Sequence, residues 1–159
     1  MVATILDRIR EKYKKIIVGG EGGAGRTTLL CRYVNGYFYT ETKMTIGVQF
    51  FTKDLKFKEK SYNFIFWDFA GQERWRFFQE DFCKGADGAI LAFDLTRPLT
   101  IESIDEWVSF LRRWNQNLPI ILVGMKLDLD EMKLIPDEIC REIVKENNLS
   151  NYFPVSCKT

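Results

Sequence analysis

Apolar and polar residues follow two different patterns along this chain. Nearly continuous apolar runs occupy residues 14–20, 88–95 and 119–125. Such runs are typical of strands that are covered on both faces of a sheet. Residues 48–57 and 62–69 show partial alternation and are rich in aromatic and β-branched side chains. We expect these two segments to form a hairpin across the lysine-rich stretch between them.

Helical spacing separates several of these strands. Apolar residues recur at intervals of three and four in residues 27–36, 100–114 and 136–148, and a last short strand is expected at residues 151–156. Strands that alternate with helices predict an α/β fold, with a mostly parallel six-stranded sheet and helices on both faces. Ligands of such sheets bind at the carboxyl ends of the strands.

Composition excludes several kinds of chemistry. The 159 residues suit one domain, and the net charge of +1 gives no reason to expect nucleic acid as a partner. Histidine is absent and the four cysteines show no C-x-x-C spacing, which argues against zinc and excludes histidine-based catalysis. Scattered cysteines indicate reduced thiols in a cytoplasmic protein. No apolar run is long enough to predict a transmembrane segment.

The stretch "GEGGAGRTT" (20–28) follows the first predicted strand and precedes a helical pattern. Gly20 and Gly25 have the spacing of a phosphate-binding loop, G-x-x-x-x-G-K-[ST], but Arg26 stands at the lysine position. Backbone N–H groups of such a loop can surround phosphate oxygens at a helix N-terminus, and Thr27 can offer a hydroxyl to Mg²⁺. The alternative interpretation is a glycine-rich strand-to-helix turn.

A second loop, "WDFAGQERW" (67–75), also follows an apolar strand. Asp68 is a carboxylate at the end of that strand, where it has little structural use unless it meets a cation. Gly71 allows a close approach of backbone to phosphate, and the Gln72 amide can orient a water molecule. A strand-ending turn with a solvated acid is the alternative.

Two further loops follow predicted strands, "VGMKLDL" (123–129) and "SCK" (156–158). Asp128 can accept two hydrogen bonds from the N1–H and N2–H₂ groups of guanine, two residues after Lys126. Each loop is unremarkable alone, but four loops in order end four predicted parallel strands.

Over residues 14–158 the chain resembles a small GTPase of the Ras superfamily, most like the Rab branch. The segments "TIGVQF" (45–50), "WDFAGQERWR" (67–76) and "GAILAFDLT" (88–96) carry this resemblance closely. It implies the fold of a P-loop NTPase (a small G domain) and a molecular switch that binds GTP or GDP with Mg²⁺ and hydrolyses GTP slowly.

The resemblance also implies site residues. Gln72 and Arg26 would be catalytic, Gln72 by positioning the attacking water. Thr27, Thr45 and Asp68 would serve Mg²⁺, and the backbone N–H of Gly71 would sense the γ-phosphate. The residues that would bind the phosphates are Gly20, Glu21, Gly22, Gly23, Ala24, Gly25, Arg26, Thr27 and Thr28. Those that would bind the base and its surroundings are Phe38, Lys126, Asp128, Leu129, Ser156, Cys157 and Lys158.

Partners are implied too. Effector, GTPase-activating and exchange-factor proteins would bind residues 37–50 and 70–82. Phe50, Trp67 and Phe82 match an aromatic triad that Rab proteins present to effectors, although packing within the domain explains these aromatic residues equally well.

The sequence departs from the family pattern at Arg26, at Met125, where the family has asparagine, and at Cys157, where it has alanine. A final family helix and a prenylation motif are not found in these 159 residues. A pseudo-GTPase, which would use the same fold as an interaction module with weak or absent nucleotide binding, therefore remains an alternative. An ATPase with another P-loop fold fits Asp128 and the "SCK" loop poorly.

We divide the chain into an N-terminal extension, residues 1–13, and a G domain, residues 14–159. Val2, Ile5, Leu6 and Ile9 have helical spacing and are followed by basic residues. This amphipathic segment predicts either a peripheral contact with an anionic membrane or, as we favour, packing against the domain or a neighbouring chain.

Overall fold

The computed structural model describes residues 12–39, 44–71 and 76–159, without the side chains of residues 76–78. The amphipathic segment predicted near the N-terminus lies outside these residues, and Tyr13 already belongs to the first strand. In the described part of the chain no helix is long and apolar enough to cross a membrane. The four cysteines are free.

The described residues confirm the predicted α/β fold. They contain one six-stranded sheet with the strand order β2-β3-β1-β4-β5-β6. Neighbouring strands are parallel, except that β2 runs antiparallel to β3. The strands are β1 (Tyr13–Gly19), β2 (Val48–Phe57), β3 (Lys60–Phe69), β4 (Gly88–Asp94), β5 (Ile120–Met125) and β6 (Asn151–Pro154).

The predicted hairpin forms with a two-residue turn. Lys58 and Glu59 connect β2 to β3, and both have left-handed backbone angles, with φ of 46° and 63°. A turn with two positive φ values matches the right-handed twist of a hairpin, although glycine and asparagine adopt these angles more easily than lysine and glutamate do.

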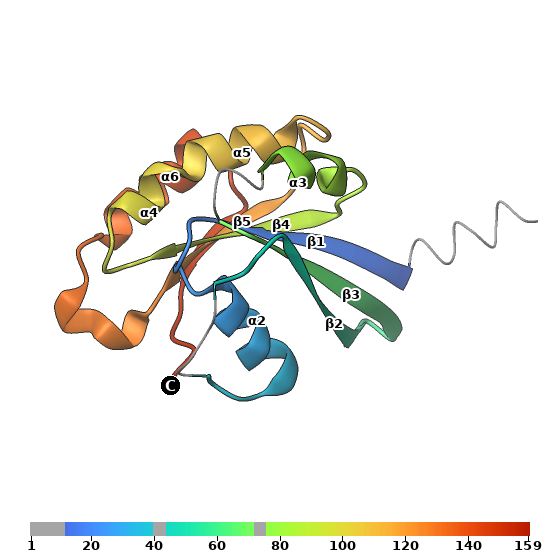
Figure 1. Cartoon of the computed structure of the whole chain (residues 1–159), viewed down its shortest axis with the longest axis horizontal. Coiled ribbons are helices and arrows are strands. Elements are labelled where there is room, and N and C mark those ends of the chain that lie inside the picture. Colours follow the sequence, from blue (N-terminus) through green and yellow to red (C-terminus); the bar gives the residue numbers. More distant parts are fainter. Residues whose placement is uncertain (1–11, 40–43, 72–75) are drawn as a thin grey trace, which may run out of the picture.

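Helices cover both faces of the sheet, as expected (Figure 1). The helix α2 lies on one face, and α3, α4, α5 and α6 lie on the other. The bounds are α2 (Arg26–Asn35), α3 (Arg76–Cys83), α4 (Leu99–Glu102), α5 (Ile104–Arg112), α6 (Asp137–Glu146) and a 3₁₀ segment, η2 (Leu127–Met132).

One predicted helix is divided in the structure. Residues 100–114 were expected to form a single helix, but Ser103 separates α4 from α5, which ends at Arg112. The shorter helix α4 is attached to the end of β4, because the buried hydroxyl of Thr100 accepts a hydrogen bond from the backbone N–H of Asp94 at 2.9 Å.

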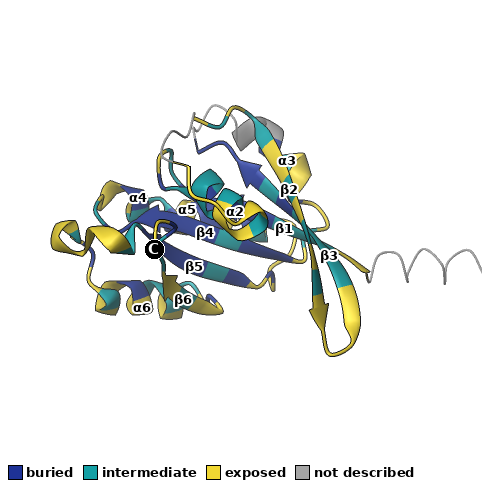
Figure 2. Cartoon of the chain, turned by 90° about the horizontal axis from the view of Figure 1, so that it is seen from below, coloured by how far each residue is buried: buried dark blue, intermediate teal, exposed yellow. Residues whose placement is uncertain are grey.

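The main core lies between the sheet and the helices α3, α5 and α6. Trp107 of α5 is almost fully buried there, beside Leu91 and Phe93 of β4. A smaller cluster of Val18, Leu30 and Phe66 fills the α2 side. Because both faces of the sheet are covered, β4 and β5 form a buried strip through the middle of the molecule (Figure 2). The loops that follow the parallel strands are attached to the ends of this buried layer.

Gly19, the last residue of β1, tests how tightly α5 is packed on the sheet. A Cβ atom on Gly19 would lie 2.8 Å from Cε3 of Trp107, whereas a Cβ on Gly88 of the neighbouring strand would meet its nearest atom at 3.4 Å. We expect Gly19→Ala to lower the free energy of unfolding by about 1–3 kcal/mol, measured by urea denaturation. Gly88→Ala is the matched control and should cost less. Adding Trp107→Phe makes room for the new methyl group, so equal costs of Gly19→Ala with and without Trp107→Phe would contradict this contact.

Candidate functional site

Four loops that the sequence singled out lie at one edge of the sheet. They follow the carboxyl ends of β1, β3, β5 and β6, which are parallel strands, so the fold brings them to the same end of the molecule. The loop of residues 20–25 connects β1 directly to α2.

Glycines shape this first loop. Gly20, Gly23 and Gly25 have φ values of 130°, 77° and 99°, which side chains other than glycine rarely allow. Gly20 is also pressed against the sheet, because a Cβ atom there would overlap the carbonyl oxygen of Ala92. The loop thereby wraps around the N-terminus of α2, where backbone N–H groups and the helix dipole favour an anion.

Arg26, at the start of α2, is turned into the protein. Its side chain is 5% exposed, its Nη1 donates to the carbonyl of Gly20 at 2.5 Å, and its Nε lies 3.8 Å from Oδ1 of Asp68. Burial raises the pKa of the Asp68 carboxyl even though Arg26 opposes this shift, and burial likewise lowers the pKa of Arg26. Removing both charges from water therefore costs more than their attraction returns at this separation.

Oxygen atoms suited to a hard cation gather beside this pair. The Thr27 hydroxyl donates to Oδ2 of Asp68 at 2.5 Å and lies 2.9 Å from the Thr45 hydroxyl. The other carboxylate oxygen, Oδ1 of Asp68, is buried without a hydrogen-bond partner among the described residues. Two hydroxyls and an unsatisfied carboxylate oxygen fit Mg²⁺, which prefers oxygen ligands.

The second loop touches the first. A Cβ atom on Gly71 would overlap the backbone nitrogen of Gly22, so the two loops are in backbone contact. Ala70 donates its N–H to the carbonyl of Gly47 at 2.8 Å, which joins this loop to the segment that contains Thr45. The predicted catalytic Gln72 lies outside the described residues.

The third and fourth loops are joined through Asp128. The hydroxyl of Ser156 donates to Oδ1 of Asp128 at 2.8 Å, and the backbone N–H groups of Lys158 and Thr159 donate to the Ser156 oxygen at 3.1 and 3.2 Å. Asp128, Leu129 and Lys158 are exposed, so the Asp128 carboxylate can reach a ligand.

Lys126 has a partner that the sequence did not reveal. Its Nζ lies 2.6 Å from Oδ2 of Asp94, a fully buried residue at the end of β4. Burial opposes ionisation of Asp94, but hydrogen bonds from Lys126 and Thr96 outweigh it and lower its pKa. The signal was the same as for Asp68, an acid that ends an apolar strand. Arg97 was also missed; its Nη1 donates to the carbonyl of Gly22 at 3.3 Å.

Met125 and Cys157, two of the departures from the family pattern, are neighbours in space. Both are buried in one apolar cluster with Ala92 and Val123. The Cε of Met125 would lie 3.3 Å from a Cβ on Gly25, so the methionine supports the first loop from below. Burial raises the pKa of Cys157 to about 11, which keeps its thiol protonated at neutral pH. A buried apolar side chain, Met125, thus occupies the position where the family pattern has the amide of asparagine.

Aromatic side chains form an exposed surface next to the loops. The ring centroids of Phe50 and Trp67 are 4.6 Å apart, and those of Trp67 and Phe82 are 5.5 Å apart. Phe50 is 54% exposed and Phe82 is 39% exposed, so packing within the domain does not account for the whole triad. Phe38, the residue expected to lie against the base, is 37% exposed beyond the end of α2.

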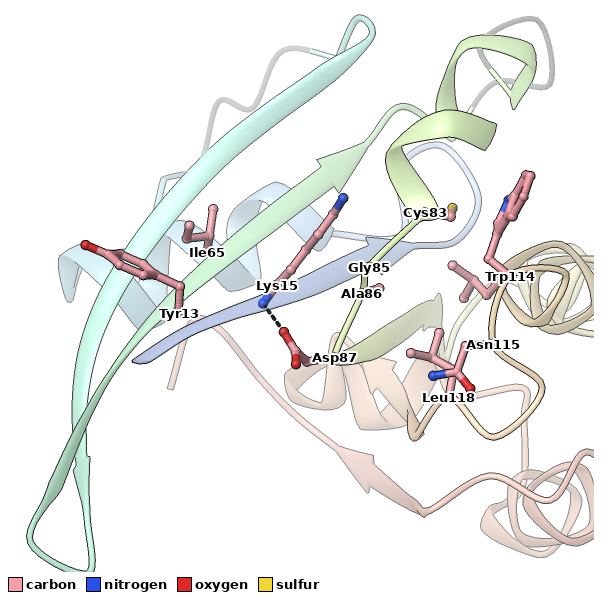
Figure 3. A pocket seen from close by; sticks show the side chains of 11 residues that line it. Tyr13, Lys15, Ile65, Cys83, Gly85, Ala86, Asp87, Trp114, Asn115 and Leu118 are labelled. Atoms are coloured by element: carbon pink, nitrogen blue, oxygen red, sulfur yellow. Dashed lines mark hydrogen bonds between the residues drawn. The ribbon is translucent and has the colours of Figure 1, made fainter. Parts of the chain in front are cut away.

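A cavity of about 470 Å³ lies away from these loops (Figure 3). Tyr13, Lys15 and Asp87 line it, and the backbone N–H of Lys15 donates to Asp87 at 2.8 Å. These residues belong to the beginning of β1 and the turn before β4, so the cavity lies at the opposite end of the parallel strands. Its position separates it from the candidate site.

Comparisons with known proteins agree with the resemblance seen in the motifs. The model of the Ras family matches residues 15–159. The chain is 38% identical over 136 residues to the Ras-related protein RABA1e of Arabidopsis thaliana, an alignment that covers 85% of this chain and 63% of that protein. The chain therefore spans less than two thirds of the length of this relative.

The ion pair between Lys126 and Asp94 should make the free energy of unfolding depend on pH in the acid range. A lowered pKa means that ionised Asp94 stabilises the fold above its ordinary pKa of about 4, and that this contribution disappears as the pH falls through the folded-state pKa. We expect Lys126→Met to cost about 1 kcal/mol at pH 7, a modest value because Lys126 is 38% exposed and water screens the pair. The cost should shrink below pH 4.

Urea denaturation at pH 7, 5 and 3.5 measures this dependence. Lys145→Met, at an exposed lysine of α6, controls for the loss of one positive charge. A cost of Lys126→Met that stays constant across this range would contradict the stabilising role of the pair.

Proposed function

The chain belongs to the Ras family, and we propose that it is a Rab-like molecular switch that binds guanine nucleotides and hydrolyses GTP slowly to GDP. The observation that carries this proposal is the meeting of a phosphate-type loop with the Asp128–Ser156 pair at one edge of the sheet. In this proposal residues 20–28 surround the phosphates at the N-terminus of α2.

Guanine would be recognised through the carboxylate of Asp128. The hydroxyl of Ser156 already orients this carboxylate, and its exposed oxygens can accept hydrogen bonds from the N1–H and N2–H₂ groups of guanine. Lys126, Leu129, Cys157 and Lys158 would complete the surroundings of the base, with Phe38 against its other side.

Thr27, Thr45 and Asp68 would hold Mg²⁺. When bound, this ion would neutralise the charge that develops on the phosphates during hydrolysis. Gln72 would position the attacking water, and the charge of Arg26 would attract the phosphates into the loop.

Switching would involve residues 37–47 and 70–82. Thr45 and the Gly71 loop already contact Thr27 and Gly22, the parts of the first loop that a γ-phosphate would approach. A γ-phosphate could therefore hold both segments, and its loss would release them. Effectors, activators and exchange factors would bind at residues 37–50 and 70–82, where the exposed Phe50 and Phe82 offer apolar surface beside the partly buried Trp67. The four free thiols support a cytoplasmic location, and a peripheral membrane contact stays a prediction.

The second candidate is a pseudo-GTPase that serves as an interaction module. Arg26 favours it, because this side chain is engaged by Gly20 and Asp68 rather than left open to a ligand. Met125 favours it as well, because a thioether replaces an amide that could bind polar groups.

Titration with fluorescent GDP separates these two functions. A switch binds GDP measurably, and each departure should weaken binding by about 1–3 kcal/mol through polar groups left unpaired, which is about 5-fold to 150-fold. We expect Arg26→Lys and Met125→Asn each to tighten binding and the double variant to bind tightest. Met125→Asn should also lower stability, because it buries an amide among apolar side chains.

Two outcomes of this titration count against the proposal. If the parent and all three variants bind no GDP, the interaction module is the better function. If the parent already binds as tightly as the double variant, the effects assigned to Arg26 and Met125 are wrong.

Single-turnover hydrolysis tests the role given to Gln72. We expect Gln72→Leu to slow GTP hydrolysis while leaving nucleotide affinity nearly unchanged, because leucine cannot orient a water molecule. The measurement is phosphate release from a GTP-loaded protein, compared with an affinity titration of the same preparation. Hydrolysis at the parent rate would remove Gln72 from the mechanism.

A further inference from the structure

The buried carboxylate of Asp68 requires compensation of its charge. Its side chain is fully buried, and an isolated ionised carboxylate is very costly away from water. In the described part of the chain it meets the hydroxyls of Thr27 and Thr45 and, at 3.8 Å from Oδ1, Nε of Arg26, which is the positive charge beside it.

Arg26 is fixed in this position. Its side chain is only 5% exposed, and Nη1 donates a hydrogen bond to the Gly20 carbonyl. A guanidinium stays protonated in proteins, so the positive charge beside Asp68 is permanent. The arginine thereby links the end of β1 to the end of β3.

We infer that Arg26 is a built-in counter-ion of Asp68 that takes over part of the charge compensation otherwise supplied by Mg²⁺ in this site. The inference rests on the proposed function and adds a regulatory property to it. A divalent cation held by Thr27, Thr45 and Asp68 enters a site in which Arg26 already offsets part of the carboxylate's charge, and Arg26 repels the cation. Magnesium therefore adds less to nucleotide affinity than it would without this arginine.

The covalent structure of arginine offers a sharp test. The atom that faces Asp68 is Nε, and lysine has a methylene group at the corresponding point of its side chain. Arg26→Lys therefore keeps a positive charge at the start of α2 but removes the nitrogen that lies 3.8 Å from Oδ1 of Asp68. Arg32→Lys is the matched control, because Arg32 lies in the same helix and bonds the Gly36 carbonyl, far from Asp68 in its contacts.

The first measurement is the rate at which fluorescent GDP leaves the loaded protein, in Mg²⁺ and after excess EDTA. We expect EDTA to accelerate release from the parent and from Arg32→Lys by about threefold or less. The same treatment should accelerate release from Arg26→Lys at least about tenfold, because its affinity depends more on the metal than that of the parent, by about 0.7 kcal/mol or more.

The second measurement uses Mg²⁺ alone on the nucleotide-free protein. We expect magnesium chloride to raise the melting temperature of Arg26→Lys by several degrees and to leave the parent unchanged, relative to the same ionic strength of sodium chloride. If the parent binds no GDP, the proposed function fails while this second measurement still decides the inference. Equal responses of parent and Arg26→Lys to the metal, in whichever of the two measurements the proteins allow, overturn it.

Discussion

The contact between the buried side chains of Arg26 and Asp68 determines how the functional edge of this molecule is organised. Arg26 is the first residue of α2 and Asp68 lies at the end of β3, so their pairing joins the two elements that flank the first and second loops. Thr27 adds a second link between α2 and β3, because its hydroxyl donates to Asp68. The Thr27 hydroxyl also contacts that of Thr45, which connects this pair to the segment before β2. Because desolvation outweighs the attraction within the pair, this edge contains stored electrostatic cost.

A second constraint lies below this contact. Met125, which shares an apolar cluster with Cys157, packs beneath Gly25 of the first loop through apolar contact and not through hydrogen bonds. Dispersion contacts are not directional, so they hold the loop close without fixing the orientation of its N–H groups. By contrast, the bonds between Asp128 and Ser156 are directional and fix the base-side loops. The two halves of the site are thus held by different physical means.

Much of the architecture could be predicted from the sequence because it depends on patterns that are local. The apolar runs located the parallel strands, and the carboxyl-end rule then placed four loops at one edge. The division of the helix at Ser103 could not be predicted, because the apolar residues Ile101, Ile104 and Trp107 keep helical spacing across the break. The direction of Arg26 was equally inaccessible, since a glycine-rich loop admits an outward and an inward arginine, and the choice depends on Asp68 in a distant strand. Asp94 is predictable by contrast, because it ends an apolar strand just as Asp68 does.

The two outer strands of the sheet end it in different ways. At one side β6 is four residues long and finishes at Pro154, which has no N–H group to offer another strand. At the other side β2 extends over ten residues and leaves its outer backbone groups unpaired by the sheet. Lysines at positions 53 and 56 lie along that strand, and positive charge is a common protection of free edges against pairing between molecules. Charge is screened by salt, whereas a missing N–H group is not. We therefore expect salt to weaken the protection of the β2 edge by positive charge, and to leave the effect of Pro154 on the β6 edge unchanged.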